Sequence, residues 1–127
     1  MNLVIDCSAA IATIHDGAEP LRIPPANLYA PELIDVEYAS AIRRFVSRRE
    51  LSAANADRYI ETWASTPIRR SRHLPLLPRI WQLRENISSY DAAYVALAER
   101  LAAPLVTADR RLARAASAYC EVITVDG

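Results

Sequence analysis

Short apolar runs alternate with amphipathic stretches along the whole chain. A run rich in β-branched residues and bounded by turn residues predicts a buried strand, whereas apolar residues spaced three or four apart predict a helix. We therefore expect strands at residues 3–6, 27–30, 104–107 and 121–125. We expect helices at residues 8–14, 31–49, 52–63, 76–86, 88–102 and 108–117. Residues 67–73, with the sequence PIRRSRH, fit either a short strand or a basic loop.

Prolines and a glycine place several boundaries between these elements. A linker is expected between the first helix and the second strand, at Gly17, Pro20, Pro24 and Pro25. Pro31 is expected at the first position of the second helix, where a missing N–H group costs nothing. Pro78 is expected to break the helix at residues 76–86, and Pro104 to stop the helix before it.

The alternation of strands and helices predicts the fold class. In a single small chain it indicates a mostly parallel sheet that is covered by helices on both faces. We therefore expect an α/β protein, a three-layer α/β/α sandwich with a mostly parallel central sheet, in one domain spanning residues 1–127. A chain of this length buries roughly two thirds of the surface that its unfolded form exposes, which is enough for one core.

Acidic residues fall at the junctions between predicted strands and helices. Asp6 and Asp109 follow strands, Asp91 begins the helix at residues 88–102, and Glu37 lies about six residues inside the helix that follows Pro31. Each aspartate also fits a structural role as a helix cap or a first-turn acid. Glu37 fits an exposed helix acid equally well. None of the four indicates a functional site when taken alone.

The topology of a parallel sheet brings the four acids together. Strand C-termini and helix N-termini share one edge of such a sheet, and that edge is where open α/β proteins keep their sites. Buried carboxylates that repel one another require cations or protons. A set of oxygen ligands without Cys or His favours Mg²⁺ or Mn²⁺, and such an ion suits hydrolysis of phosphodiesters.

Composition excludes several classes of protein. Fifteen acids balance fifteen basic residues, all of them arginine, so the net charge of zero gives no indication of a nucleic-acid partner. Gly17 and Gly127 are the only glycines, which rules out the glycine-rich phosphate-binding motifs. Cys7 and Cys120 lack the spacing of a zinc site and suggest a reducing compartment. Without a membrane-spanning run or a leader, the chain is expected to be soluble and cytoplasmic.

Four motifs, in this order and spacing, resemble those of the PIN-domain ribonucleases, and the small size resembles the VapC toxins of toxin–antitoxin pairs. The motifs are VIDCSA, PELIDVEYASAI, YDAAYVALA and LVTADRRL. The resemblance covers nearly the whole chain, and the last two motifs are specific only in combination. It implies a catalytic, metal-binding acidic site, formed by Asp6, Glu37, Asp91 and Asp109 with Mg²⁺ or Mn²⁺ as the cofactor.

The same resemblance implies supporting residues and partners. Ser8 and Thr107 are expected to support the acids, whereas Ser40 stands where many members of the family have Asn, which puts that contact in doubt. The implied activity is that of an endoribonuclease toxin that cleaves structured RNA. The implied partners are a cognate VapB-type antitoxin and a second copy of the chain in a homodimer.

Arginines near the acids are candidates for RNA contacts. Arg44 and Arg48 lie seven and eleven residues beyond Glu37, and Arg110 and Arg111 follow Asp109 directly. For each arginine alone, a solvated helix face explains its position better, so we expect only that some of them bind phosphate. Base stacking is possible for Tyr38, Tyr90 and Tyr94, although their spacing and apolar neighbours favour the core.

Three other functions compete with the toxin hypothesis. A phosphorylation-dependent receiver module also has an acidic Mg²⁺ pocket, but it requires paired acids after the first strand and a Lys, whereas Cys7 follows Asp6 and the chain has no Lys. A binding protein that no longer cleaves is disfavoured by the complete set of acids. An RNA-processing nuclease outside toxin–antitoxin systems retains the same chemistry, and gene neighbourhood distinguishes it from a toxin.

Overall fold

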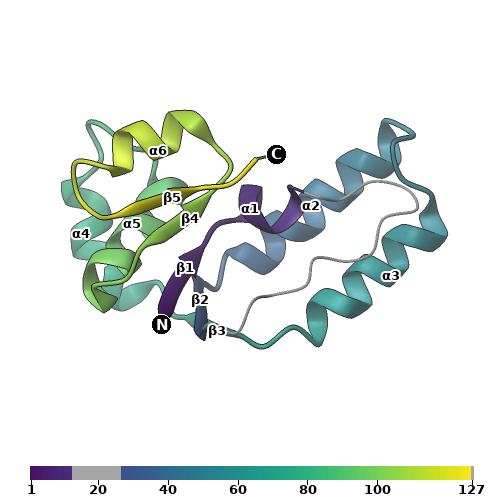
Figure 1. The fold of residues 1–127 in the computed structure, drawn as a ribbon, viewed down its shortest axis with the longest axis horizontal. Coiled ribbons are helices and arrows are strands. Elements are labelled where there is room, and N and C mark those ends of the chain that lie inside the picture. The colour runs from purple at the N-terminus through teal and green to yellow at the C-terminus, as the bar shows by residue number, and fades with distance from the viewer. Residues whose placement is uncertain (13–26, 127) are drawn as a thin grey trace.

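The computed structural model describes residues 1–12 and 27–126 (Figure 1). The linker predicted at Gly17 and the three prolines after it lies outside the described residues, as do the last two residues of the helix expected at 8–14.

Within the described part of the chain, five strands form one sheet in the order β3-β2-β1-β4-β5. Every neighbouring pair is parallel, with Val4 of β1 facing Tyr29 of β2 on one side and Leu105 of β4 on the other. The strands are β1 Asn2–Ile5, β2 Asn27–Pro31, β3 Ile68–Ser71, β4 Leu105–Thr107 and β5 Val122–Thr124. The uncertain segment at residues 67–73 is therefore a strand, and it lies at one edge of the sheet.

Helices cover both faces of this sheet. They are α1 Cys7–Ile11, α2 Ile34–Ser47, α3 Ala53–Ala64, the 3₁₀ turn η1 Leu74–Leu76, α4 Leu77–Gln82, α5 Ser89–Leu101 and α6 Arg110–Ala116. From β1 to β3 the chain moves toward one edge of the sheet, and from β3 to β5 it moves toward the other edge. Because the connections between parallel strands are right-handed, these opposite directions place α2 and α5 on opposite faces of the sheet. In Figure 1 the α2–α3 hairpin extends to one side, and α4, α5 and α6 gather on the other. The predicted three-layer α/β sandwich is confirmed.

The core is built around β1 and α5. Leu3, Val4 and Ile5 are consecutive and all buried, as expected for a strand covered on both faces. Helix α5 is buried through residues 92–98, so it lacks a polar side over that length and packs against β1, β2 and β4. Its N-terminus is consequently fixed relative to the strand ends.

Two proline predictions require correction. Pro31 is the last residue of β2 and not the first of a helix, because α2 begins three residues later, at Ile34. Proline is tolerated at both kinds of boundary, and the fixed φ angle alone does not distinguish them. Pro78 does not break its helix but lies in the first turn of α4, after the 3₁₀ turn.

The C-terminus of α5 supplies a first testable prediction. Ala102 ends the helix with φ 48° and ψ 43°, a left-handed conformation in which its Cβ is strained. We expect Ala102→Gly to raise the free energy of unfolding by about 0.5–1 kcal/mol. Urea denaturation measures the change. The matched control is Ala113→Gly inside α6, where the same substitution is expected to lower stability by about 1 kcal/mol.

Across the described residues, no helix has both the length and the apolar character needed to cross a membrane.

Candidate acidic site

The strand order creates a crevice between β1 and β4. From β1 the sheet grows one way through β2 and β3, and the other way through β4 and β5, so the connections diverge where β1 and β4 meet. Ligands of open α/β sheets bind at such a switch point, beyond the carboxyl ends of the strands. Asp6 follows β1 directly, and Thr107 is the last residue of β4.

Asp6 is held by three donors at this point. Its Oδ1 accepts hydrogen bonds from the Ser8 hydroxyl at 2.8 Å and the Ala9 N–H at 2.9 Å, and its Oδ2 accepts from the Thr107 hydroxyl at 2.5 Å. The Ala9 bond makes Asp6 the N-cap of α1, as its position in the sequence suggested. Only 5% of Asp6 is exposed, so its carboxylate is fixed in one orientation.

Ser8 and Thr107 also connect β1 to β4. The Ser8 oxygen accepts from the Ala108 N–H at 2.9 Å, the Thr107 oxygen accepts from the Asp109 N–H at 3.1 Å, and the two hydroxyl oxygens lie 3.1 Å apart. Each hydroxyl has one proton, and both protons point at Asp6. These two residues therefore position the acid that follows β1 and the backbone of the turn that follows β4.

Asp109 caps the helix that follows β4. Its Oδ1 accepts from the Arg111 N–H at 2.9 Å and the Leu112 N–H at 3.1 Å, which makes it the N-cap of α6. Asp91 lies in the first turn of α5, where the Ser88 hydroxyl accepts from its N–H at 3.2 Å. Asp6 and Asp109 are thus N-caps and Asp91 is a first-turn acid, as expected, and each places a carboxylate at the same edge of the sheet.

Glu37 approaches the crevice from α2. It lies in the first turn of that helix, not six residues inside it as expected, because α2 begins at Ile34. The hydroxyl of Tyr94, which is 1% exposed, donates to Glu37 Oε1 at 2.5 Å. This bond between α5 and α2 fixes the glutamate against the core.

Three of the acids have raised pKa values. Burial is the main cause for Asp6, Glu37 and Asp91. The charge of Asp91 further raises the pKa of Asp6 and of Glu37, the charge of Asp6 raises that of Glu37, and the charge of Asp109 raises that of Asp91. Asp6, Glu37 and Asp91 therefore form one electrostatically coupled group, to which Asp109 is joined through Asp91.

The acids are near one another but do not form a ready-made cage. Among residues 1–12 and 27–126, no three His, Cys, Asp or Glu side chains have the geometry to hold a metal ion as they stand. Hydrogen bonds to Tyr94, Ser8 and Thr107 hold Glu37 and Asp6 in place. Any shared ion would have to be bound through waters or through small movements of these side chains.

Two open clefts flank the acids. One, of about 470 Å³, is lined by Cys7, Ser8, Ile11, Val36, Glu37, Ser40, Arg44 and Tyr90. The other, of about 210 Å³, is lined by Asn86, Ile87, Ser88, Asp91, Arg111, Leu112 and Ala115. Ser40 thus lies beside Glu37, as its position one helical turn later implied.

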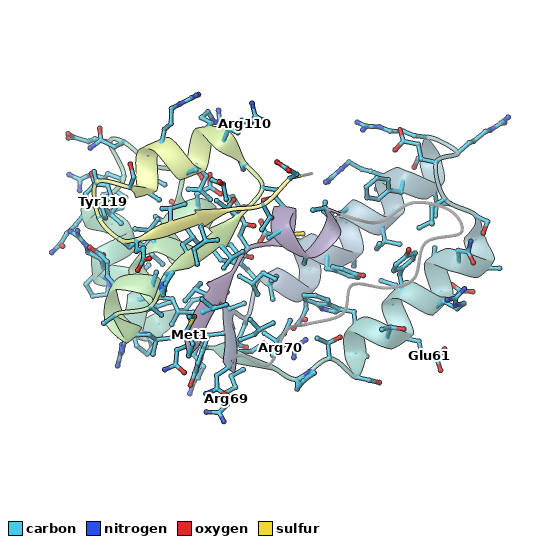
Figure 2. The ribbon with its side chains drawn as sticks, viewed as in Figure 1. Met1, Glu61, Arg69, Arg70, Arg110 and Tyr119 are labelled. Carbon is cyan, nitrogen blue, oxygen red and sulfur yellow. The ribbon has the colours of Figure 1, made fainter. Side chains whose placement is uncertain are left out.

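The structure separates the arginines predicted as RNA contacts. Arg44 lines the first cleft and Arg111 the second, whereas Arg48 and Arg110 line neither. Figure 2 shows Arg110 projecting from the surface of α6. Of the four arginines, Arg44 and Arg111 are therefore the two that lie beside the acids in these clefts.

The three tyrosines also divide. Tyr38 is buried and stacks on Trp63 with ring centroids 4.1 Å apart, and Tyr94 is buried against Glu37. Both belong to the core, as expected. Tyr90 instead lies 69% exposed at the rim of the first cleft.

Sequence reasoning missed two features of this site. The bond from Tyr94 to Glu37 joins residues 57 positions apart, and local spacing carries no signal for it. Cys7 packs half-buried against the core and also lines the first cleft, beside Glu37. Burial, followed by the charges of Glu37 and Asp6, raises the pKa of its thiol to about 12, so it stays protonated. Its place directly after Asp6 was the available signal.

Removing the Tyr94 hydroxyl tests how firmly Glu37 is held. In Tyr94→Phe, Glu37 loses a hydrogen bond that lowers its pKa, so that pKa is expected to rise further. Loss of a bond to a charged group also lowers the free energy of unfolding, by about 1.5 kcal/mol. An NMR titration of the glutamate carboxyls and urea denaturation measure the two effects. Tyr38→Phe is the control, since it removes a neighbouring buried hydroxyl and should leave the Glu37 titration unchanged.

Comparisons with known proteins identify the family that the chain is similar to. The family model described as "PIN domain" matches residues 3–118. Ribonuclease VapC9 of Mycobacterium tuberculosis is 43% identical over 124 residues, covering 97% of this chain and 98% of its own. The crystal structure of PAE2754 from Pyrobaculum aerophilum has a TM-score of 0.69 at 22% identity, covering 98% of this chain and 92% of that one. VapBC-5, a toxin–antitoxin family member from Mycobacterium tuberculosis, has a TM-score of 0.57 at 21% identity, covering 99% and 98%.

Proposed function

The chain belongs to the PIN domain family, and from that premise we propose that it is a Mg²⁺- or Mn²⁺-dependent endoribonuclease acting as the toxin of a toxin–antitoxin pair. The observation that carries this proposal is the coupled group of Asp6, Glu37 and Asp91 at the switch point between β1 and β4. Curated relatives that match over nearly their whole length are named as VapC ribonucleases, which supports the activity.

The chemistry of the side chains fits a hard divalent cation. The donors are carboxylate oxygens, and each of the three coupled acids has a pKa raised by burial and by a neighbouring acid, a cost that a cation would offset. Mg²⁺ usually keeps several waters and binds one or two carboxylates directly, so it does not need three of them in contact at once. Asp6, Glu37, Asp91 and Asp109 would hold the ion, which when bound would activate water and stabilise the departing oxygen.

The chain's own residues contribute positioning and charge. Ser8 and Thr107 hold the Asp6 carboxylate, and Tyr94 holds that of Glu37, so both acids are oriented before a substrate binds. Arg44 and Arg111 supply positive charge in the clefts on either side, which offsets the repulsion between a polyanion and the acids. The high pKa of Cys7 keeps its thiol neutral and out of the chemistry.

The proposed partners are those of the toxin family. We infer that a VapB-type antitoxin neutralises the protein, and that two copies form a homodimer. Co-expression with the antitoxin encoded beside the gene should restore growth and yield a complex that elutes together in size-exclusion chromatography.

Sequencing of RNA ends after brief expression tests the function. We expect new ends at one or a few sites in the induced culture, and the purified protein should cut the same sites only when Mg²⁺ or Mn²⁺ is present. Cleavage without inhibition of growth would instead favour an RNA-processing nuclease. Binding of RNA with no cleavage at any divalent-ion concentration would contradict the proposal and favour the non-catalytic binding module.

A further inference from the structure

The first turn of α5 separates the two clefts that flank the acids. Tyr90 and Asp91 are consecutive residues of that turn, yet Tyr90 lines the larger cleft and Asp91 the smaller. Glu37 faces the larger cleft, so the coupled acids are divided between the two. A phosphodiester that reacts at the coupled acids, which would hold it through a divalent ion, must therefore lie over the first turn of α5, and the rest of its strand must continue into both clefts.

Each cleft has one arginine placed for the neighbouring phosphates. Arg44 lies two helical turns beyond Glu37 on α2, about 10 Å along the axis, and its charge reaches Cys7 in the same cleft. Arg111 lines the other cleft, and its charge lowers the pKa of Asp91. The salt bridges of the described residues, Arg70–Asp35 and Arg79–Glu99, involve neither of them. Among residues 1–12 and 27–126, neither guanidinium group is therefore held in a salt bridge.

Tyr90 is the aromatic side chain at the crossing point. It is 69% exposed, in contrast to Tyr38 and Tyr94, which are buried in the core. An exposed ring beside a phosphate-binding cleft provides a stacking surface for a base, and stacking tolerates any base sequence. A base inside a duplex has both of its faces covered and cannot use this surface.

We propose that an RNA strand crosses the first turn of α5, with Arg44 and Arg111 binding phosphates on opposite sides of the scissile bond and Tyr90 stacking on an unpaired base between them. This substrate path rests on the proposed nuclease function. It assigns separate roles to the two clefts and to three side chains, and it predicts that the local segment at the cut must be unpaired.

Matched pairs of arginine variants test the phosphate contacts. The fluorescence anisotropy of a labelled single-stranded oligoribonucleotide, measured in EDTA, reports binding independently of cleavage. Arg44→Gln and Arg111→Gln are each expected to weaken binding about tenfold and to reduce the slope of log K against log salt by about 0.7. Arg48→Gln and Arg110→Gln remove the same charge from the C-cap of α2 and from the first residue of α6, and each is expected to change Kd by less than about twofold. Equal weakening in all four variants, or in none, would overturn the path.

A fluorescent base analogue tests the stacking. An oligoribonucleotide that carries aminopurine at the cleavage position should be quenched when the wild-type protein binds it. Tyr90→Ala is expected to lose the quenching and about tenfold in affinity, and Tyr90→Trp to restore both. Trp81→Ala is the control, since Trp81 is an exposed aromatic on α4, 64% accessible, that lines neither cleft. Quenching that survives Tyr90→Ala would contradict the assignment.

The experiments separate this inference from the function on which it rests. If the wild-type protein binds RNA through Arg44, Arg111 and Tyr90 but does not cleave it with Mg²⁺ or Mn²⁺, the nuclease proposal fails and the binding path remains. If the protein cleaves RNA and the cleft variants behave like their controls, the nuclease proposal remains and the path is wrong.

Discussion

Asp91→Asn is expected to lower RNA cleavage by at least about 100-fold and to raise the midpoint of thermal unfolding of the metal-free protein. The substitution removes a carboxylate that is coupled to Asp6, Glu37 and Asp109, so the remaining acids bind a divalent ion less well. It also removes a half-buried charge, and the raised pKa of Asp91 means that its ionised form is disfavoured in the folded protein. Activity and stability should therefore change in opposite directions, which loss of folding cannot produce.

The predicted gain in stability of Asp91→Asn depends on pH. A carboxyl with a raised pKa binds its proton more tightly in the folded than in the unfolded state. Its contribution to stability is complete below the unfolded value, near 3.8 for Asp91, and is lost as the pH rises through the folded value. In EDTA, the wild-type protein should therefore lose more stability than Asp91→Asn between pH 4 and neutral pH. Asp57→Asn, which changes an exposed acid on α3, is the control and should match the wild type.

Thr107→Val is expected to lower the free energy of unfolding by about 2 kcal/mol and cleavage by about tenfold or more. The two side chains have nearly the same shape, but valine lacks the hydroxyl that donates to Asp6 and accepts from the Asp109 N–H. The Asp6 carboxylate and the Asp109 N–H each lose a hydrogen bond, and water cannot replace it easily because residue 107 is 0% exposed. The hydrogen bond from Thr107 is also the largest of the effects that lower the pKa of Asp6, so that pKa should rise further.

Urea denaturation and a cleavage assay with a fluorescent RNA measure these two losses. Thr124→Val is the matched control, because Thr124 lies on the adjacent strand β5 and is exposed. We expect it to change stability by less than about 0.5 kcal/mol. A wild-type cleavage rate in Thr107→Val would show that the Asp6 carboxylate does not need this bond, and would remove Thr107 from the site.

Local chemistry made most of the fold predictable. The predicted strands and helices differ in the spacing of their apolar residues, so the sequence distinguishes them. The side chains at three helix starts accept hydrogen bonds from backbone N–H groups, as their positions suggest: Asp6, Ser52 and Ser88. The boundaries around Pro31 were wrong because proline suits both the end of a strand and the start of a helix. The misplaced start of α2 in turn made Glu37 look like an interior residue rather than a first-turn acid.

The site was predictable where it depends on topology and unpredictable where it depends on distant pairs. Parallel strands bring their C-termini to one edge, so the sequence was enough to place the four acids together. The partner of the Tyr94 hydroxyl depends on where the start of α2 lies relative to α5, which no local pattern encodes. The same holds for the choice between Arg44 and Arg48, since only the position of the cleft distinguishes them. That the acids bind Mg²⁺ or Mn²⁺ stays a prediction.

Two of the four acids have a structural role in addition to their proposed catalytic one, and this has an evolutionary consequence. Asp6 and Asp109 are helix caps as well as candidate ligands, whereas Glu37 and Asp91 cap nothing. A descendant that abandoned cleavage would lose folding stability if it replaced either cap, but would gain stability by neutralising Asp91. Decay of such a lineage should therefore erase Asp91 and Glu37 first, and leave Asp6 and Asp109 as the longest-lived traces of a nuclease ancestor.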